Sequence, residues 1–394
     1  MNFQKSNLIK DTGAYAFAEV DKLVDNLKQK GIKPIDFGVG DPSSPTPDFI
    51  NKSGKQGIED FKSAGYPSYI GDANFLEACS SYMKKNFQVD LDPKTEITST
   101  IGSKEAVFHL PFGFINPGDT VIIPTPGYPP MLTGTRFAYG KPYIVGLFEE
   151  NNFMIDYESI PSEVAEKAVI MWVNYPNSPT GKSASLDYYR GLVAWAQKYN
   201  IIIAADEGCY IDIYFGNDKP HSILEVQKEG IITFYSLSKR NNMTGWRIGF
   251  VAGDQNLVEV FRKVKTNIDS GTPNFIQKAA ITALNDDDHA QEMRDEYLLK
   301  KNILLETLSS VGFPKMEVDA TFYVWQKAPN NMNGLDLAKK LLDEKIAVVT
   351  TPGAWISSKD DILNKNPGEN FVRFALVPTV EEVKEACLRI KANF

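Results

Sequence analysis

The chain has 394 residues, of which 43% are hydrophobic and 23% charged, and this length can hold two globular domains with substantial cores. Its formal net charge of −8 argues against nucleic acid as the main partner, because no basic excess exists to neutralise phosphates. The three cysteines form no CxxC pair and the three histidines have no metal-ligand spacing, so neither a disulfide framework nor a metal site is expected.

The N-terminal part of the chain is predicted to contain two helices and one short strand. Residues 1–6 hold no apolar signal core, and no apolar run in the chain is long enough to span a bilayer, so we expect a cytoplasmic protein. Residues 15–30 carry apolar side chains at helical spacing, and residues 72–87 form a second predicted helix. Residues 35–42 between them favour a short strand that ends in a glycine turn.

Alternating strands and helices are predicted from about residue 100 onward. Short, unbroken apolar runs suit strands that are buried on both faces of a largely parallel sheet, and they lie at 121–124, 169–173, 201–206, 231–235 and 248–252. The segments 103–116 and 184–199 have helical patterns. These elements predict a doubly wound α/β domain, which binds ligands beyond the carboxyl ends of its strands.

The pattern loosens after about residue 285. A smaller α+β domain is predicted there, with helices at 287–311, 335–344 and 380–391 and strands at 321–325 and 371–376. We therefore divide the chain into a large domain at 48–285 and a small domain at 286–394, which the N-terminal segment at 1–47 joins.

A lysine with possible phosphate-binding neighbours is the most informative local feature. Ser236 precedes Lys239 by three residues, and Arg247 follows it by eight. A hydroxyl and a guanidinium can hold a phosphate dianion while a lysine amine reaches an aldehyde on the same small molecule. That is the arrangement a pyridoxal-phosphate enzyme needs. Taken alone, a lysine in a Ser-x-x-Lys pattern is usually a solvated loop lysine, so the interpretation of Lys239 depends on the other residues of the site.

Two charged residues stand in apolar strands. Asp206 ends a predicted strand at the ligand edge of the sheet, where its carboxylate could keep a pyridine nitrogen protonated or could cap the next turn. Arg373 interrupts the strand at 371–376, where it could bind a substrate carboxylate in bidentate fashion or form a structural ion pair.

Three loops add further candidates. The turn at 102–104 opens a predicted helix whose backbone N–H groups favour phosphate, although Ser103 could be a plain N-cap. Tyr128, in the turn at 126–129, could stack on a flat ring or pack within the turn. In the loop at 174–181 a fixed amide could hydrogen-bond a phenolic oxygen or its own backbone.

Together these stretches resemble the class I and II aminotransferases of pyridoxal-phosphate fold type I, over about residues 12–391. The most specific part of the resemblance is the Ser-x-Ser-Lys…Gly-x-Arg segment together with the preceding Asp206. The resemblance implies a homodimeric enzyme that uses pyridoxal phosphate to move an amino group between an amino acid and a 2-oxo acid.

The resemblance also implies roles for individual residues. Lys239 would be the Schiff-base lysine and proton shuttle, Asp206 would pair with the pyridine nitrogen, and Tyr128 would stack on the ring. The substrate carboxylate would bind to Arg373, near Gly40. The phosphate would be held by residues from several loops: Ser103, Lys104 through its backbone, Ser236, Arg247 and, across a dimer interface, Tyr66.

Two positions depart from the family pattern. The family usually has Asn immediately before Pro-Thr-Gly, where this chain has Ser178, and we predict that Asn177 takes that role by a local shift. The family also often has Tyr three residues after the aspartate. Here Cys209 holds that position and Tyr210 follows, as if Gly208 were inserted, so Tyr210 is predicted to reach the ring oxygen.

Within the family, the turns at 102–105 and 126–129 and the segment at 243–247 look most like the diaminopimelate aminotransferases and their aspartate- or alanine-using relatives. A pyridoxal-phosphate-dependent carbon–sulfur β-lyase would use the same residues and is the competing interpretation. A transcriptional regulator would need an added basic module, for which the N-terminal segment is too short. A catalytically dead binding protein would have no use for both Lys239 and Asp206.

Overall fold

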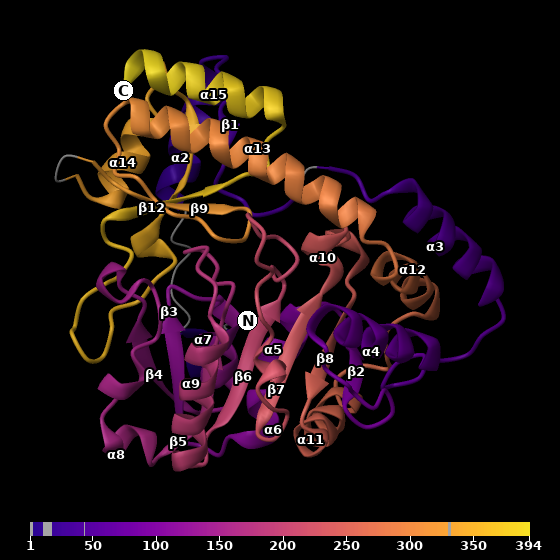
Figure 1. The fold of residues 1–394 in the computed structure, drawn as a ribbon. Helices are drawn as coiled ribbons and strands as arrows, with labels where there is room; N and C mark the ends of the chain where they lie inside the picture. The colour runs from indigo at the N-terminus through magenta and orange to yellow at the C-terminus, as the bar shows by residue number, and fades with distance from the viewer. Residues whose placement is uncertain (1–2, 11–17, 43, 330–331) are drawn as a thin grey trace.

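A seven-stranded sheet forms the centre of the computed structural model, which describes residues 3–10, 18–42, 44–329 and 332–394 (Figure 1). Its strand order is β2-β8-β7-β6-β5-β3-β4. All neighbouring strands from β4 to β7 pair in parallel, whereas β8 is antiparallel to both of its neighbours. The predicted α/β fold with a mostly parallel sheet is therefore confirmed.

The strands of this sheet include the five that were predicted and two that were not. Their bounds are β2 (Ile97–Thr100), β3 (Thr120–Thr125), β4 (Lys141–Gly146), β5 (Ala168–Val173), β6 (Ile202–Gly208), β7 (Ile231–Ser236) and β8 (Gly249–Gly253). Strands β2 and β4 are the two that sequence patterns missed, and both lie at the edges of the sheet. Edge strands need not be continuously apolar, so their pattern is weak.

Helices cover both faces of the sheet. Because successive strand residues point to opposite faces, Ile122 packs with the cluster that includes α4 (Ala73–Phe87), α9 (Leu186–Tyr199) and α12 (Asn274–Leu284). Val121 and Ile123 pack on the other face, against α5 (Ser103–His109), α7 (Pro129–Phe137) and α11 (Gln255–Thr266). This two-sided burial explains why the central strands are continuously apolar.

Two smaller sheets lie beyond the large one. One has the order β11-β12-β9 and is antiparallel, with β9 (Tyr323–Lys327), β11 (Thr351–Pro352) and β12 (Phe371–Ala375). In the other, β1 (Ile35–Asp36) pairs in parallel with β10 (Val348–Val349), which brings the N-terminal segment against the C-terminal part of the chain. Figure 1 shows α13 (Asp288–Ser310) and α15 (Val380–Asn393) side by side above the three-stranded sheet.

The remaining helices show where predicted boundaries differ. Their bounds are α1 (Asn7–Lys10), α2 (Ala18–Gln29), α3 (Asp48–Asp60), α6 (Pro111–Phe114), α8 (Ser162–Ala165), α10 (Leu237–Arg240) and α14 (Gly334–Leu341). The first residues of the helix predicted at 15–30 lie outside the described residues. The helix predicted at 103–116 is instead α5 followed by α6, because Pro111 lacks the N–H that would continue the first helix.

None of the helices in the described ranges is long and apolar enough to cross a membrane. Among the same residues, no three His, Cys, Asp or Glu side chains are grouped so that they could hold a metal ion.

Candidate active site

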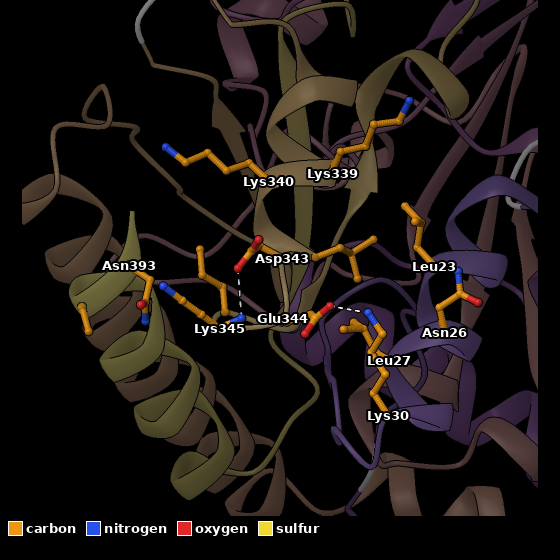
Figure 2. Close-up of a pocket in the computed structure, with 13 residues that line it drawn as sticks. Leu23, Asn26, Leu27, Lys30, Lys339, Lys340, Asp343, Glu344, Lys345 and Asn393 are labelled. Atoms are coloured by element: carbon orange, nitrogen blue, oxygen red, sulfur yellow. Dashed lines mark hydrogen bonds and ion pairs between the residues drawn. The ribbon is translucent and has the colours of Figure 1, made fainter.

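A cavity of about 770 Å³ lies between α2, α14 and α15, but it does not contain the predicted site. Figure 2 shows that its charged groups interact with one another: Lys30 pairs with Glu344, and the backbone N–H of Lys345 donates to Asp343 at 3.0 Å. None of the predicted site residues lines this cavity.

A second cavity, of about 230 Å³, lies at the carboxyl ends of the central strands, where a doubly wound sheet binds its ligands. Five of the predicted residues line it together. Its lining residues are Gly40, Tyr128, Asn174, Ser178, Asp206, Cys209, Tyr210, Lys239 and Tyr323. Four of the loops that supply them follow β3, β5, β6 and β7, which are neighbours in the sheet.

Asp206 contributes a buried carboxylate with an unused oxygen. The residue lies in β6 and is 3% exposed, and its Oδ1 has no hydrogen-bond partner. Burial raises the pKa of Asp206 from its ordinary value of 3.8 to about 7, and the charge of Glu207 adds to the rise. Burial also raises the pKa of Glu207 to about 7, but this carboxylate accepts hydrogen bonds from Ser222 and Tyr235, whereas Oδ1 of Asp206 accepts none. Asp206 is thus ready to accept from a cationic N–H group in the cavity.

Lys239 faces the same cavity from α10, directly after β7. Its Nζ donates to the carbonyl oxygen of Gly40 at 2.6 Å and lies 5.5 Å from the centre of the Phe322 ring. The next residue, Arg240, is buried and pairs with Asp212 at 3.2 Å and Asp287 at 2.7 Å. These two ion pairs fix α10, so the amine of Lys239 is held at the cavity.

Three of the five predicted phosphate-binding residues, Ser103, Ser236 and Arg247, lie on segments that come together next to Lys239. Gly102 has φ +73°, and a Cβ there would lie 2.4 Å from Nη2 of Arg247, so a side chain at this position would displace the guanidinium. Ser103 begins α5 immediately after Gly102. Arg247 donates to Oγ of Ser238 at 3.4 Å, and Ser236 donates to the same oxygen at 3.0 Å. One guanidinium and several hydroxyls therefore form a cluster suited to an anion.

Lys104 and Tyr66 occupy different positions from that cluster. Lys104 has an exposed side chain in the first turn of α5, which leaves only its backbone for the predicted role. Tyr66 is 85% exposed, yet its loop is anchored, because Ser99 and Thr98 both donate to the carbonyl oxygen of Ile70 at 2.9 Å. Within one chain Tyr66 does not line the cavity.

Two tyrosines supply aromatic rings to the cavity. Tyr128 precedes α7, and burial raises the pKa of its hydroxyl. Tyr210 also lines the cavity, together with Cys209. The pairing of β6 with β7 shifts register between Ala205 and Gly208, so one extra residue is accommodated at this point of β6. This irregularity explains how Tyr210, one position later than the family spacing, reaches the site.

Asn177 does not line the cavity, in contrast to the predicted local shift. It is fully buried, its Oδ1 accepts from the N–H of Thr180 at 3.1 Å and from the hydroxyl of Thr180 at 2.8 Å, and its amide donates to Pro126 and Asn174. The members of this loop that do line the cavity are Asn174 and Ser178. The amide of Asn177 is used inside the loop, since its turn needs those hydrogen bonds.

Arg373 lies at the centre of β12 and does not itself line the cavity, but its guanidinium packs on Tyr323, which does. One of its guanidinium nitrogens donates to the carbonyl oxygen of Gly38 at 2.7 Å, and its Nε is buried without a partner. The guanidinium carbon lies 4.5 Å from the centre of the Tyr323 ring. Among the described residues no acidic side chain forms an ion pair with Arg373, so its charge suits the binding of a substrate carboxylate.

Five residues near or in the cavity were not assigned from the sequence: Asn174, Ser178, Cys209, Ser238 and Tyr323. Four of them belong to segments that the sequence patterns indicate, namely the loop at 174–181, the residues after Asp206 and the Ser-x-Ser-Lys segment, in which other residues were predicted to act. Tyr323 is different, because it stands in an apolar strand whose pattern reports burial and carries no chemical signal.

The family model for aminotransferase class I and II matches residues 32–390 of the chain. An LL-diaminopimelate aminotransferase from Aquifex aeolicus is 43% identical over 392 residues, which is 99% of each chain. Among solved structures, substrate-bound BacF from Bacillus subtilis has a TM-score of 0.89 and 31% identity and covers 100% of this chain and 98% of its own. An aminotransferase from Neisseria meningitidis has a TM-score of 0.91 and 29% identity and covers 98% of this chain and 99% of its own.

The buried Asp206 predicts a pH dependence of stability for the protein freed of small molecules. The pKa of Asp206 is raised to about 7 in the folded protein and is about 4 in the unfolded chain. Between these two pH values the folded protein keeps a proton on this carboxylate that the unfolded chain has lost. The free energy of unfolding therefore falls as the pH rises through this range. The variant Asp206→Asn removes this ionisation. We expect it to raise the melting temperature by about 3 °C at pH 8 and by less at pH 5.

Thermal unfolding followed by circular dichroism at both pH values measures this effect. The matched control is Asp218→Asn, which neutralises an exposed carboxylate and is expected to change neither value. A variant Asp206→Asn that destabilises the protein equally at pH 5 and pH 8 would show that the carboxylate carries no burial penalty.

Proposed function

The chain belongs to the class I and II aminotransferases, and we propose that it moves the amino group of LL-diaminopimelate, or of a related aspartate-, glutamate- or alanine-type amino acid, to a 2-oxo acid. Aminotransferases of this class use pyridoxal phosphate, which is the cofactor of this enzyme. The choice of substrate rests on relatives of 38–43% identity over nearly the full chain that are named LL-diaminopimelate aminotransferases.

The observation that carries the assignment of the site is the meeting of Lys239 and Asp206 in one cavity, next to an anion-binding cluster. The free Oδ1 of Asp206 suits the protonated ring nitrogen of pyridoxal phosphate, because a cation there would relieve the cost of a buried carboxylate. Ser103, Ser236 and Arg247 suit its phosphate. The residues present therefore fit this cofactor.

Lys239 and Asp206 have the two central roles in the proposed mechanism. When bound, pyridoxal phosphate supplies a carbon that exchanges amino groups and a ring that accepts the electron pair left at the substrate Cα. Lys239 would hold the cofactor through its Nζ, and the same amine, when free, would take the proton from the substrate Cα. Asp206 keeps the proton on the ring nitrogen, and that positive charge stabilises the developing negative charge.

The remaining residues orient the reactants. Arg373 binds the substrate carboxylate through its two-pronged guanidinium, which holds the Cα–H bond in a reactive direction near Lys239. Tyr128 and Tyr210 both line the cavity, where Tyr128 would stack on the ring of the bound cofactor and Tyr210 would donate to its ring oxygen. We assign the part of the usual loop asparagine to Ser178, because Ser178 lines the cavity while Asn177 is buried and does not.

We also propose that the enzyme is a cytoplasmic homodimer. Tyr66 is 85% exposed and Tyr69 47% exposed, although both lie on a loop that is anchored to β2. Large exposed aromatic side chains on a fixed loop are typical of a protein interface. In such a dimer Tyr66 would contribute to the phosphate site of the partner subunit. The three unpaired cysteines suit a reducing compartment.

The substrate proposal predicts the order of reactivity in a panel of amino acids. We expect LL-diaminopimelate to change the visible absorbance of the lysine-bound cofactor at least about 10-fold faster, per unit of concentration, than the slowest of glutamate, aspartate and alanine. A 2-oxo acid should restore the original spectrum, because transamination is reversible. Stopped-flow mixing with each amino acid in single turnover measures the rates.

The same panel distinguishes the assigned parts of the site. For Arg373→Ala we expect the apparent dissociation constant of the amino acid to rise about 100-fold, while cofactor retention stays within about threefold of the wild type. Arg373→Lys keeps the charge but loses the bidentate geometry, so its apparent dissociation constant for the amino acid should lie between those of the wild type and Arg373→Ala. With an added amino acid that carries a thioether on Cβ, release of pyruvate, ammonia and the thiol without an aminated cofactor would instead indicate a lyase. Equal loss of cofactor and substrate binding in Arg373→Ala would make Arg373 structural.

The dimer proposal predicts a particle of twice the 43.9 kDa chain mass in sedimentation equilibrium of the cofactor-loaded enzyme. We expect Tyr66→Phe to leave the dimer intact and to release the cofactor about 10-fold more readily, since a hydrogen bond to a phosphate is lost. A monomer with full activity at low protein concentration would contradict the proposal.

A further inference from the structure

Tyr323 lies where several parts of the proposed site meet, although nothing in the sequence patterns singled it out. We propose that Tyr323 is a positioning residue, whose hydroxyl supports Tyr210 as a hydrogen-bond donor and whose ring fixes Arg373. This inference rests on the proposed function, because it concerns how the residues assigned there are held.

The backbone around Tyr323 is held by hydrogen bonds to neighbouring segments, one of which follows strand β6 of the large sheet. Tyr323 is the first residue of β9, paired with Ala375 of β12, and its N–H donates to the hydroxyl of Thr321 at 3.0 Å. Thr321 has φ +68° and donates its own N–H to the carbonyl oxygen of Ile213 at 2.7 Å. The turn before β9 is therefore anchored to the segment that follows Asp206 in the chain, which holds Tyr323 in one place.

The side chain of Tyr323 contacts three residues of the proposed site. Its hydroxyl lies 3.3 Å from the hydroxyl of Tyr210, and both are buried. The centre of its ring lies 4.5 Å from Cζ of the Arg373 guanidinium, within the range of a cation–π interaction. A Cβ on Gly40 would lie 1.8 Å from the hydroxyl oxygen, so Gly40 must lack a side chain for Tyr323 to fit. The carbonyl of Gly40 in turn accepts from Lys239 at 2.6 Å.

The two hydroxyls can form a short relay. A phenol donates one hydrogen bond and also accepts, and in this structure Tyr210 donates to Tyr323. When Tyr210 donates to the ring oxygen of the cofactor, its own oxygen becomes free to accept from Tyr323. A donor that itself accepts a hydrogen bond is polarised and becomes stronger. The other charged or titratable groups that act on Tyr210 are Arg373 and Cys209.

The test is Tyr323→Phe in the cofactor-loaded enzyme, which keeps the ring and removes only the hydroxyl. A strong donor draws negative charge from the ring oxygen, so the adjacent nitrogen holds its proton less tightly. Loss of that support should raise the pH midpoint of the visible absorbance change of the lysine-bound cofactor by about 0.5, which is less than the rise in Tyr210→Phe. We expect kcat/KM to fall about three- to tenfold.

The double variant Tyr210→Phe/Tyr323→Phe separates a relay from two independent effects. If Tyr323 acts through Tyr210, removing the Tyr323 hydroxyl should not raise the pH midpoint further in a variant that already lacks the Tyr210 hydroxyl.

The variant Gly40→Ala displaces the Tyr323 hydroxyl without removing it, because the added Cβ would occupy its position. We expect this variant also to raise the pH midpoint. The matched control is Tyr297→Phe: Tyr297 is a buried tyrosine next to Phe322 that does not line the cavity, and its loss of hydroxyl should leave the midpoint unchanged.

An unchanged midpoint in Tyr323→Phe, or an equal rise with and without the Tyr210 hydroxyl, would overturn the inference. These outcomes leave the proposed function standing, because the wild-type spectrum tests that separately. A wild-type enzyme without the absorbance of a lysine-bound cofactor would overturn the proposed function, and this inference with it.

Discussion

The site depends on a buried carboxylate oxygen that the protein itself leaves without a partner. Oδ1 of Asp206 accepts no hydrogen bond, whereas both oxygens of the adjacent Glu207 accept, one from Ser222 and Tyr235 and the other from the N–H of Ile223. An ionised carboxylate buried alone costs several kcal/mol, so such a group is kept where an incoming cation completes it. Lys239 stands in the same cavity, and the anion-binding cluster lies beside it. All three features suit one ligand with a basic ring nitrogen, a carbonyl and a phosphate.

The cavity is completed by residues from separate sheets. The large sheet supplies Asp206 and Lys239 at the carboxyl ends of neighbouring parallel strands, where side chains of successive loops converge. The three-stranded sheet supplies Tyr323, whose ring packs against Arg373 just outside the lining, and Gly40 follows the short strand β1. The hydrogen bond from Lys239 to Gly40 joins the two parts directly. A substrate bound by Arg373 and reacting near Lys239 therefore needs both sheets in their observed arrangement.

The sequence predicted the parts of this site that depend on local patterns. Continuously apolar runs identified the central strands, and the spacing around Lys239 identified the residues that share its loop. Long-range contacts and turn geometry could not be predicted from local sequence patterns. Asn177 was chosen over Ser178, yet two hydrogen bonds to Thr180 turn its side chain into the loop. Tyr210 reaches the cavity through a register shift in β6, and Tyr323 comes from a strand more than a hundred residues away in sequence. None of these three placements has a periodic signal.

The central claim is that Lys239 carries the cofactor, and chemical reduction tests it most directly. Borohydride treatment of the loaded enzyme makes the bond between lysine and cofactor permanent, and proteolysis followed by mass spectrometry locates the modified residue. The account predicts the mass of the reduced cofactor on the peptide that contains Lys239 and on no other lysine peptide. Modification of a different lysine, or none in an enzyme that still transaminates, would contradict it.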